Sequence, residues 1–96
     1  MIKNKLEIIL IFTDGCMGCK VMNNLIRDVL NDMFGECDNI DFRLINCNDV
    51  NKNVLDDYSI TDFPATIFKI NDDIKKIIIG TTTTRNIKDI ITNMIS

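Results

Sequence analysis

Residues 6–20 read LEIILIFTDGCMGCK, and this stretch decides the fold. After Glu7 the chain runs through apolar, largely β-branched residues, which is typical of a strand buried on both faces of a sheet. Two cysteines separated by two residues, Cys16 and Cys19, follow directly. The sequence therefore places a pair of thiols just beyond the end of a central strand.

The residues after the cysteine pair predict a long amphipathic helix. From Lys20 to Phe34 the apolar residues are spaced by three and four, which builds one wide apolar face. Gly35 is well placed to end this helix. Cys16 then lies at the junction of strand and helix, and Cys19 lies on the first turn. The apolar positions are Val21, Met22, Leu25, Ile26, Val29, Leu30, Met33 and Phe34.

A second strand and a short helix are predicted next. Residues 40–46 alternate between apolar and polar side chains, as a half-buried strand does. Asn48 or Asp49 is placed to cap a short helix. That helix is expected to turn four side chains inward, namely Val50, Val54, Leu55 and Tyr58.

The second half of the chain predicts a hairpin and a last helix. The runs 65–70 and 74–79 are rich in strand-forming residues and flank a short turn cluster. Beyond Gly80, Thr84 is the expected cap of a helix. The apolar residues that this helix buries are Ile87, Ile90, Ile91, Met94 and Ile95.

This order of elements, βαβα followed by ββα, predicts one domain over residues 1–96. The first two strands are joined through a helix, so they should lie parallel with a right-handed crossover. The hairpin adds two antiparallel strands. The predicted fold class is therefore α/β, with a four-stranded mixed sheet flanked by three helices that cover both faces.

Composition narrows the classes of function. Hydrophobic residues make up 46% of the chain, which supports a folded domain, and the net charge is −3 with acids and bases interleaved. Because no basic stripe is present, we expect no nucleic-acid partner. The apolar run Ile8 to Phe12 is too short to cross a membrane, and no signal-peptide pattern is visible. We therefore expect a reducing, cytoplasmic compartment, where a CxxC pair is catalytic or metal-binding rather than a permanent structural disulfide.

The position of the two cysteines suits thiol–disulfide chemistry. A thiol near a helix N-terminus meets unsatisfied N–H groups and the positive end of the helix dipole, which favour the thiolate. Cys16 is then the exposed attacking thiol. Cys19, one turn in, is the more buried resolving thiol that breaks a mixed disulfide between Cys16 and substrate. The only proline, Pro64, precedes a strand, where either a cis bond or an ordinary trans bond is compatible with the sequence.

Several segments together resemble the thioredoxin superfamily over essentially the whole chain. They are FTDGCMGCK at 12–20, Tyr58, TDFPAT at 61–66, FKINDD at 68–73 and Gly80, with Lys20 matching the lysine common after the second cysteine. The resemblance implies a thioredoxin-like fold, a redox-active Cys16–Cys19 disulfide and a cis Pro64 that faces it. By position it also implies substrate contacts at Gly15, Met17, Gly18, Asp62, Phe63 and Pro64.

The sequence departs from the thioredoxin pattern around the cysteine pair. Gly15 stands where thioredoxins usually carry tryptophan, and Met17 and Gly18 replace the usual Gly-Pro. Leu10 falls where thioredoxins place a buried aspartate that assists proton transfer, and Ile45 lies near the position of its lysine partner. Proton movement at Cys19 must then rely on water, a backbone group or Asp14, although Asp14 itself reads as a solvated loop or capping residue.

In length the chain resembles glutaredoxins more than full thioredoxins. So little sequence precedes Cys16 that the N-terminal strand and helix of a full thioredoxin are missing, as in the shorter glutaredoxin core. The paired glycine of glutaredoxins is also missing, since Gly80 is single. The chain resembles a glutaredoxin-sized core with a thioredoxin-style second half.

These observations predict a small, monomeric thiol–disulfide oxidoreductase. It would reduce protein disulfides through Cys16 and Cys19, with no bound cofactor and with electrons from a partner reductase or glutathione. One alternative is a glutathione-dependent glutaredoxin. Another is a zinc or iron–sulfur protein that uses Cys16, Cys19, Cys37 and Cys47; no metal site is predicted, because Cys37 and Cys47 do not form a second CxxC. A third is a binding module with a structural CxxC.

Two further cysteines and four aromatic residues are expected to be passive or structural, apart from Phe63. Cys37 is read as a passive loop thiol and Cys47 as a half-buried residue at the same sheet edge as Cys16. Phe63 is placed near the site and Phe68 within the sheet. Tyr58 and Phe34 are read as core residues.

Overall fold

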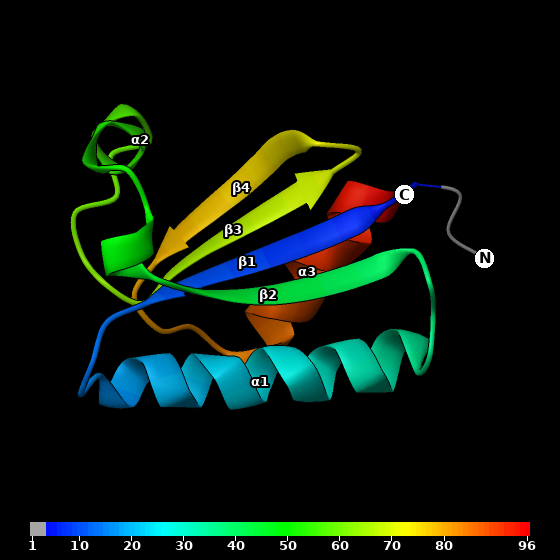
Figure 1. Ribbon diagram of the computed structural model, residues 1–96. Helices are drawn as coiled ribbons and strands as arrows, with labels where there is room; N and C mark the ends of the chain where they lie inside the picture. Colours follow the sequence, from blue (N-terminus) through cyan, green and yellow to red (C-terminus); the bar gives the residue numbers. More distant parts are fainter. Residues whose placement is uncertain (1–3) are drawn as a thin grey trace.

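The computed structural model describes residues 4–96, and its strands and helices follow the predicted order (Figure 1). The strands are β1 (Leu6–Phe12), β2 (Ile40–Asn46), β3 (Ala65–Ile70) and β4 (Asp73–Ile79). The helices are α1 (Met17–Phe34), α2 (Lys52–Asp57) and α3 (Thr84–Ile95), and a single 3₁₀ turn, η1 (Cys47–Asp49), precedes α2.

The sheet has the order β2-β1-β3-β4, with β1 parallel to β2 and antiparallel to β3. β4 pairs antiparallel with β3 and closes the hairpin. In this register Leu10 lies opposite Leu44 on one side and opposite Thr66 on the other. The predicted α/β class, the parallel pair and the hairpin are all confirmed.

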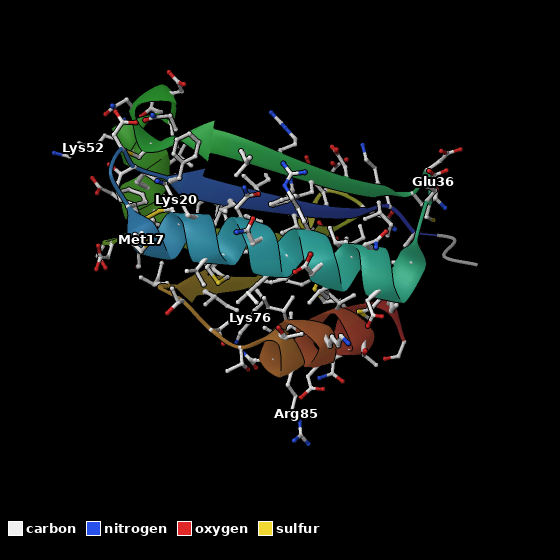
Figure 2. The ribbon with its side chains drawn as sticks, turned by 90° about the horizontal axis from the view of Figure 1, so that it is seen from below. Met17, Lys20, Glu36, Lys52, Lys76 and Arg85 are labelled. Atoms are coloured by element: carbon white, nitrogen blue, oxygen red, sulfur yellow. A yellow bond between two sulfur atoms is a disulfide. The ribbon has the colours of Figure 1, made fainter. Side chains whose placement is uncertain are left out.

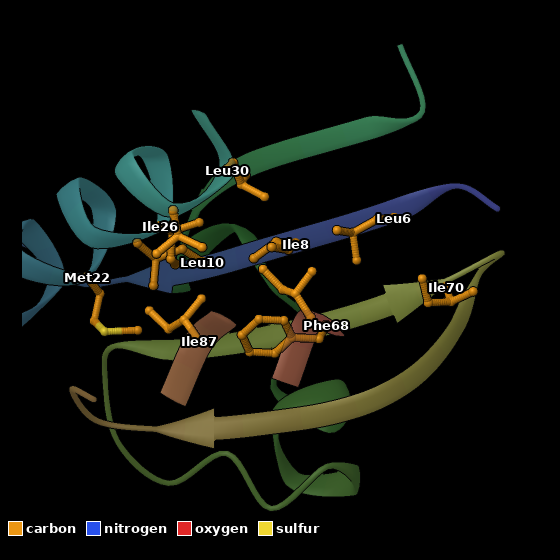
Figure 3. Close-up of a cluster of buried hydrophobic side chains, with 11 residues drawn as sticks. Leu6, Ile8, Leu10, Met22, Ile26, Leu30, Phe68, Ile70 and Ile87 are labelled. Carbon is orange, nitrogen blue, oxygen red and sulfur yellow. The ribbon is translucent and has the colours of Figure 1, made fainter. Parts of the chain in front are cut away.

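The helices α1 and α3 lie side by side over one face of the sheet (Figure 1). Side chains alternate along a strand, so every second residue of β1 points toward these helices. Leu6, Ile8 and Leu10 do so, and they meet α1, α3 and β3 in the larger hydrophobic cluster (Figure 3). The buried members of this main cluster are Leu6, Ile8, Leu10, Met22, Ile26, Val29, Leu30, Phe68, Ile70, Ile87 and Ile91.

The opposite face of the sheet is covered by α2 at one end only (Figure 1). There Ile11, Ile60, Ala65 and Ile67 form a second cluster, against which Leu55 of α2 and Phe63 pack. Toward the other end of the same face, Glu7 is 8% exposed and lies between Arg43 and Lys69, whose side-chain nitrogens approach its carboxylate at 3.4 and 3.5 Å. Both faces thus carry a helix, as predicted, but unequally.

Two helix caps differ from the prediction. Asn46 caps η1 by accepting a hydrogen bond from the Asn48 N–H, so the region of Asn48 and Asp49 belongs to a separate turn. Asn51 caps α2 instead. At α3 the cap is Thr83 rather than Thr84, because the Thr83 hydroxyl accepts from the N–H three residues on.

Three apolar side chains predicted to face inward are exposed, and those predictions are wrong. Tyr58 is 46% exposed, and Val54 and Val21 are exposed to a similar degree. Because α2 has only six residues, it presents one narrow face to the sheet, and Leu55 takes it. Val21 lies beside the buried stripe of α1 that contains Met22. Phe34 is partly buried against the main cluster.

The two ends of the sheet differ. At one end β1 leads into α1, and α2 and the start of β3 lie close by (Figure 1). At the other end lie Ser96, the start of β1 and the hairpin turn at Asn71. The side chain of Asn71 ties the turn to the chain before β1, since it accepts from the Lys5 N–H at 2.9 Å and donates to Asn4 at 3.0 Å.

Candidate active site

Three connections bring the candidate residues to one end of the sheet. The loop from β1 to α1 carries the cysteine pair, Pro64 directly precedes β3, and Gly80 directly follows β4. The Gly80 N–H donates to the Pro64 carbonyl at 2.7 Å, which joins the second and third of these segments. The site is therefore assembled from parts of the chain that are far apart in sequence.

Cys16 is the N-cap residue of α1, and its sulfur accepts a hydrogen bond from the Cys19 N–H at 3.0 Å. Gly15, with φ +71°, makes the turn that brings the chain from β1 into this cap. The sulfurs of Cys16 and Cys19 form a disulfide, with the two Cα atoms 5.2 Å apart. Cys16 is partly exposed and Cys19 is 5% exposed, the order expected for an attacking and a resolving thiol.

Pro64 packs against the first turn of α1. The Phe63–Pro64 peptide bond is cis, and the Asp62 carboxylate accepts from the Phe63 N–H at 2.9 Å. Gly18 lies so close that a Cβ placed on it would be 3.4 Å from Pro64 Cδ and 3.1 Å from Thr81 Cγ2. The absence of a side chain at Gly18 is what lets the helix, the proline and Thr81 approach one another.

The residues predicted to contact substrate lie on two segments, the start of α1 with the loop before it, and the chain directly before β3. Met17 is 72% exposed at the start of α1, and Figure 2 shows it with Lys20 at the end of the helix beside α2. Asp62 is exposed, Phe63 is partly buried and Pro64 is buried. Sequence reasoning missed Thr81, although its place directly after Gly80 was a usable signal.

A pocket of about 310 Å³ opens on the other flank of the disulfide. Its charged members are Asp14 and Lys20, and the Asn46 side-chain amide donates to the Asp14 carboxylate at 3.4 Å. Asp14 is an exposed loop residue and is not the cap of α1. The lining residues are Phe12, Thr13, Asp14, Gly15, Cys16, Cys19, Lys20, Asn23 and Leu44.

A scan against family models matches the thioredoxin model over residues 1–93. The chain belongs to the thioredoxin family. Among curated proteins, none matches it. With the Cys16–Cys19 disulfide at the CxxC position, membership of the thioredoxin family supports thiol–disulfide oxidoreductase chemistry.

Solved structures with the same fold include other thioredoxins. Thioredoxin-2 of the malaria parasite, described as a component of that parasite's protein secretion machinery, has a TM-score of 0.74 at 14% identity, covering 97% of this chain and 86% of that one. A mutant thioredoxin from Halobacterium salinarum gives a TM-score of 0.74 at 14% identity, covering 97% and 77%. A further malarial protein gives 0.76 at 12% identity, covering 97% and 100%.

At the position of the buried aspartate of thioredoxins, this member of the family has an apolar row. Leu10 is fully buried, and its neighbour on β2 is Leu44. Ile45, which the sequence comparison placed near the lysine partner, lies opposite Ile11 and points to the other face. Leu44, not Ile45, therefore shares the face of Leu10 and borders the pocket beside Cys19.

The other two cysteines lie apart from each other in this thioredoxin fold. Cys47 begins η1 at the sheet end that carries the disulfide, and packs partly buried against the second cluster. Cys37 follows the far end of α1, whose 18 residues span about 27 Å. Within residues 4–96, no three His, Cys, Asp or Glu side chains are grouped as metal ligands. No helix in that range is long and apolar enough to cross a membrane.

Proposed function

We propose that this protein reduces disulfide bonds in protein substrates through the Cys16–Cys19 couple. The observation that carries the proposal is the hydrogen bond from the Cys19 N–H to the Cys16 sulfur at the N-terminus of α1. A backbone donor and the positive end of a helix dipole both stabilise negative charge on that sulfur. Cys16, which is also the more exposed of the two, is the nucleophile in this proposal.

The reaction is a pair of thiol–disulfide exchanges. The Cys16 thiolate attacks one sulfur of the substrate disulfide, whose S–S bond breaks and releases the first substrate thiolate. Cys19, as thiolate, then attacks the Cys16 sulfur of the mixed disulfide and releases the second. Both substrate thiolates take protons from water, and the pair is left oxidised. Two electrons from a partner reductase or from glutathione restore the dithiol, without a bound cofactor.

The substrate is an extended peptide segment that crosses the Phe63–Pro64 bond beside the disulfide. Met17 supports this proposal because it offers a large exposed apolar side chain next to Cys16. Gly15, Gly18 and Asp62 border the same approach, and none of them brings a bulky side chain to it. We propose that the protein works as a monomer in a reducing, cytoplasmic setting, where such disulfides are transient.

Single cysteine variants test the assignment of the nucleophile. Cys16→Ser should abolish reduction of insulin disulfides, whereas Cys19→Ser should accumulate a covalent mixed disulfide at Cys16, visible by mass spectrometry. Undiminished insulin reduction by Cys16→Ser would show that Cys16 is not the nucleophile. A mixed disulfide formed equally well at Cys37 or Cys47 would contradict the choice of pair.

The second candidate is a glutathione-dependent glutaredoxin, in which the same Cys16–Cys19 pair takes its electrons from glutathione. A redox titration of the Cys16–Cys19 pair separates the two candidates. A midpoint near −270 mV is expected for a thioredoxin-like reductase, and one near −200 mV for a glutaredoxin-like protein. Turnover coupled to glutathione and glutathione reductase would favour the glutaredoxin reading in the same way.

A further inference from the structure

The hydroxyl of Thr66 is buried and makes no hydrogen bond to the described residues. The residue lies completely buried on β3. Among the buried side-chain nitrogen and oxygen atoms of residues 4–96, Thr66 Oγ1 alone lacks a hydrogen-bond partner. A hydroxyl in this condition costs free energy, and valine would fill almost the same space without that cost. We therefore asked which group could accept a hydrogen bond from Thr66 in another redox state of the protein.

The position of Thr66 points to Cys19 as that partner. Across the sheet, Leu44, Leu10, Thr66 and Ile78 form one row on the face covered by α1 and α3. Leu44, at one end of the row, lines the same pocket as Cys19.

The first turns of α1 lie near this row. Gly18 contacts Pro64, which is two residues before Thr66. Met22, one turn beyond Cys19, packs with Leu10 in the main cluster (Figure 3). Cys19 has the same buried orientation toward the sheet as Met22. Cys19 is 5% exposed, so its side chain is buried on the side of α1 that faces the sheet and the row containing Thr66.

Reduction changes what the Cys19 sulfur requires. In the disulfide the sulfur is neutral and bonded to Cys16. Once two electrons have opened the bond, a buried thiolate or thiol remains, which is costly without a hydrogen-bond partner. Leu10 and Leu44 offer none, and the charged side chains that line the pocket, Asp14 and Lys20, are exposed to water.

We propose that the Thr66 hydroxyl donates a hydrogen bond to the Cys19 sulfur in the dithiol form, and so stabilises the reduced state of the pair. The proposal rests on the proposed function. Thr66 keeps its own proton throughout: the Cys19 thiolate attacks Cys16, the substrate sulfur leaves as a thiolate, and that thiolate takes its proton from water. The hydroxyl thus replaces, on a neighbouring strand, a polar group that Leu10 does not supply.

Thr66→Val and Thr66→Ser form a matched pair of variants. Valine keeps the shape and removes the hydroxyl, whereas serine keeps the hydroxyl and removes a methyl group. Each protein is equilibrated with glutathione redox buffers at a fixed pH, and its oxidised fraction is measured. For Thr66→Val we expect the equilibrium constant for reduction to fall about tenfold, which moves the midpoint about 30 mV more negative. Thr66→Ser should stay within about twofold of the wild type.

A purely structural role would not move the midpoint. Urea unfolding of oxidised and reduced protein should show Thr66→Val stabilising or sparing the oxidised form while destabilising the reduced form. An unchanged midpoint, or equal stability changes in both forms, would overturn the proposal for Thr66 alone. A wild-type chain with no two-electron transition would overturn the proposed function and the Thr66 proposal together. Thr66→Ala, which also lacks the hydroxyl, allows the same comparison if the valine variant does not fold.

Discussion

At Cys16 one sulfur atom belongs both to the helix and to the candidate chemistry. It closes the N-terminus of α1 by accepting the Cys19 N–H, and it also forms the disulfide. Two exposed charged residues, Asp14 and Lys20, line the same pocket as Cys16. An anion and a cation in the same pocket should act on the Cys16 thiolate in opposite directions.

Removing either charge should therefore change the reactivity of reduced Cys16. Asp14→Asn should speed its alkylation by iodoacetamide at neutral pH about two- to threefold, because a repelling carboxylate is lost. Lys20→Gln, the matched control, should slow it by a similar factor. The rate at Cys16 is followed by mass spectrometry, and 1 M salt should bring both variants toward the wild type. Equal rates at low salt would show that neither charge reaches the sulfur.

The contact between Gly18 and Thr81 predicts a coupled pair of substitutions. Alanine is a better helix former than glycine by about 0.5–1 kcal/mol, but its Cβ at position 18 would press on Thr81 Cγ2. Thr81→Ser removes that methyl group. Gly18→Ala should thus raise the free energy of unfolding more in the Thr81→Ser background than alone, with a coupling of about 0.5 kcal/mol or more. Urea unfolding of the four proteins measures it, and strict additivity would contradict the contact.

Much of the site was predictable residue by residue, and the rest depended on contacts across the fold. The CxxC after a buried strand marked Cys16 and Cys19, and the proline before β3 marked Pro64. Thr66 carries no local signal, and Thr81 carries only its place directly after Gly80. Their importance arises from a helix turn pressed against a loop, and from a strand register that sets Thr66 beside Leu10.

Among the elements, α1 and α3 are joined at their surfaces by one ion pair. Lys88 Nζ of α3 lies 2.6 Å from the Asp32 carboxylate of α1. The hydrogen bond from Lys88, and then its charge, hold the pKa of Asp32 below its usual value. A carboxylate with a lowered folded-state pKa adds stability above its unfolded pKa, and that stability is lost as the pH falls through the folded one.

Lys88→Gln should therefore be less stable than the wild type near neutral pH and equally stable in acid. The difference is expected above about pH 4 and should disappear as Asp32 becomes protonated. Unfolding of both proteins by urea between pH 2.5 and 7 measures it. Because the Asp32 side chain is 66% exposed and that of Lys88 40%, the effect should be small and weaker in 1 M salt. A difference that persists at pH 2.5 would mean that Lys88 acts through packing.

The elements were easier to predict than their ends. The continuous apolar run of β1 and the two runs of the hairpin predicted these strands to within a residue or two. For β1 and β3 the reason is burial on both faces, which leaves little choice of side chain. The strand β4 is exposed or partly buried, and its isoleucines after the turn cluster marked it instead. The region after β2 was harder, since Asn46, Asn48 and Asn51 are all competent caps. Which asparagine caps which turn depends on the path of the backbone from β2 to β3, which the local sequence does not specify.

In the whole molecule, the two hydrophobic clusters have different tasks. The main cluster, between the sheet and the helices α1 and α3, contains most of the fully buried side chains. The second cluster lies under α2 and includes Phe63, the residue before Pro64. Stability should reside in the first cluster, and the shape of the candidate site in the second.

Truncations in the two clusters should separate these tasks. Ile87→Ala, in the main cluster, should lower the free energy of unfolding by about 3 kcal/mol. Leu55→Ala, at a partly buried site on α2, should cost about 1 kcal/mol but raise the KM for a protein disulfide substrate, because Leu55 and Phe63 pack against the same second cluster. Urea unfolding and insulin reduction measure the two effects. Similar stability losses, or a KM shift only in Ile87→Ala, would contradict this division.

The unequal cover of the two faces was the part of the architecture that the sequence left open. The hydrophobic patterns say that both faces are apolar, but not how far a six-residue helix reaches. Glu7 illustrates the difficulty: it lies in an apolar run and faces the side that α2 does not cover, where Arg43 and Lys69 flank it. Glu7 and its two partners lie on three neighbouring strands, so these ion pairs follow from the sheet register and not from the local sequence.

The separation of the two ends of the sheet has a practical consequence for capturing partners. Ser96 lies at the end tied by Asn71, and the disulfide lies at the opposite end (Figure 1). A linker that joins Ser96 to a resin would leave the cysteine pair facing the solution. The protein could then serve as bait on a solid support, releasing with dithiothreitol only those molecules that it had bound through sulfur.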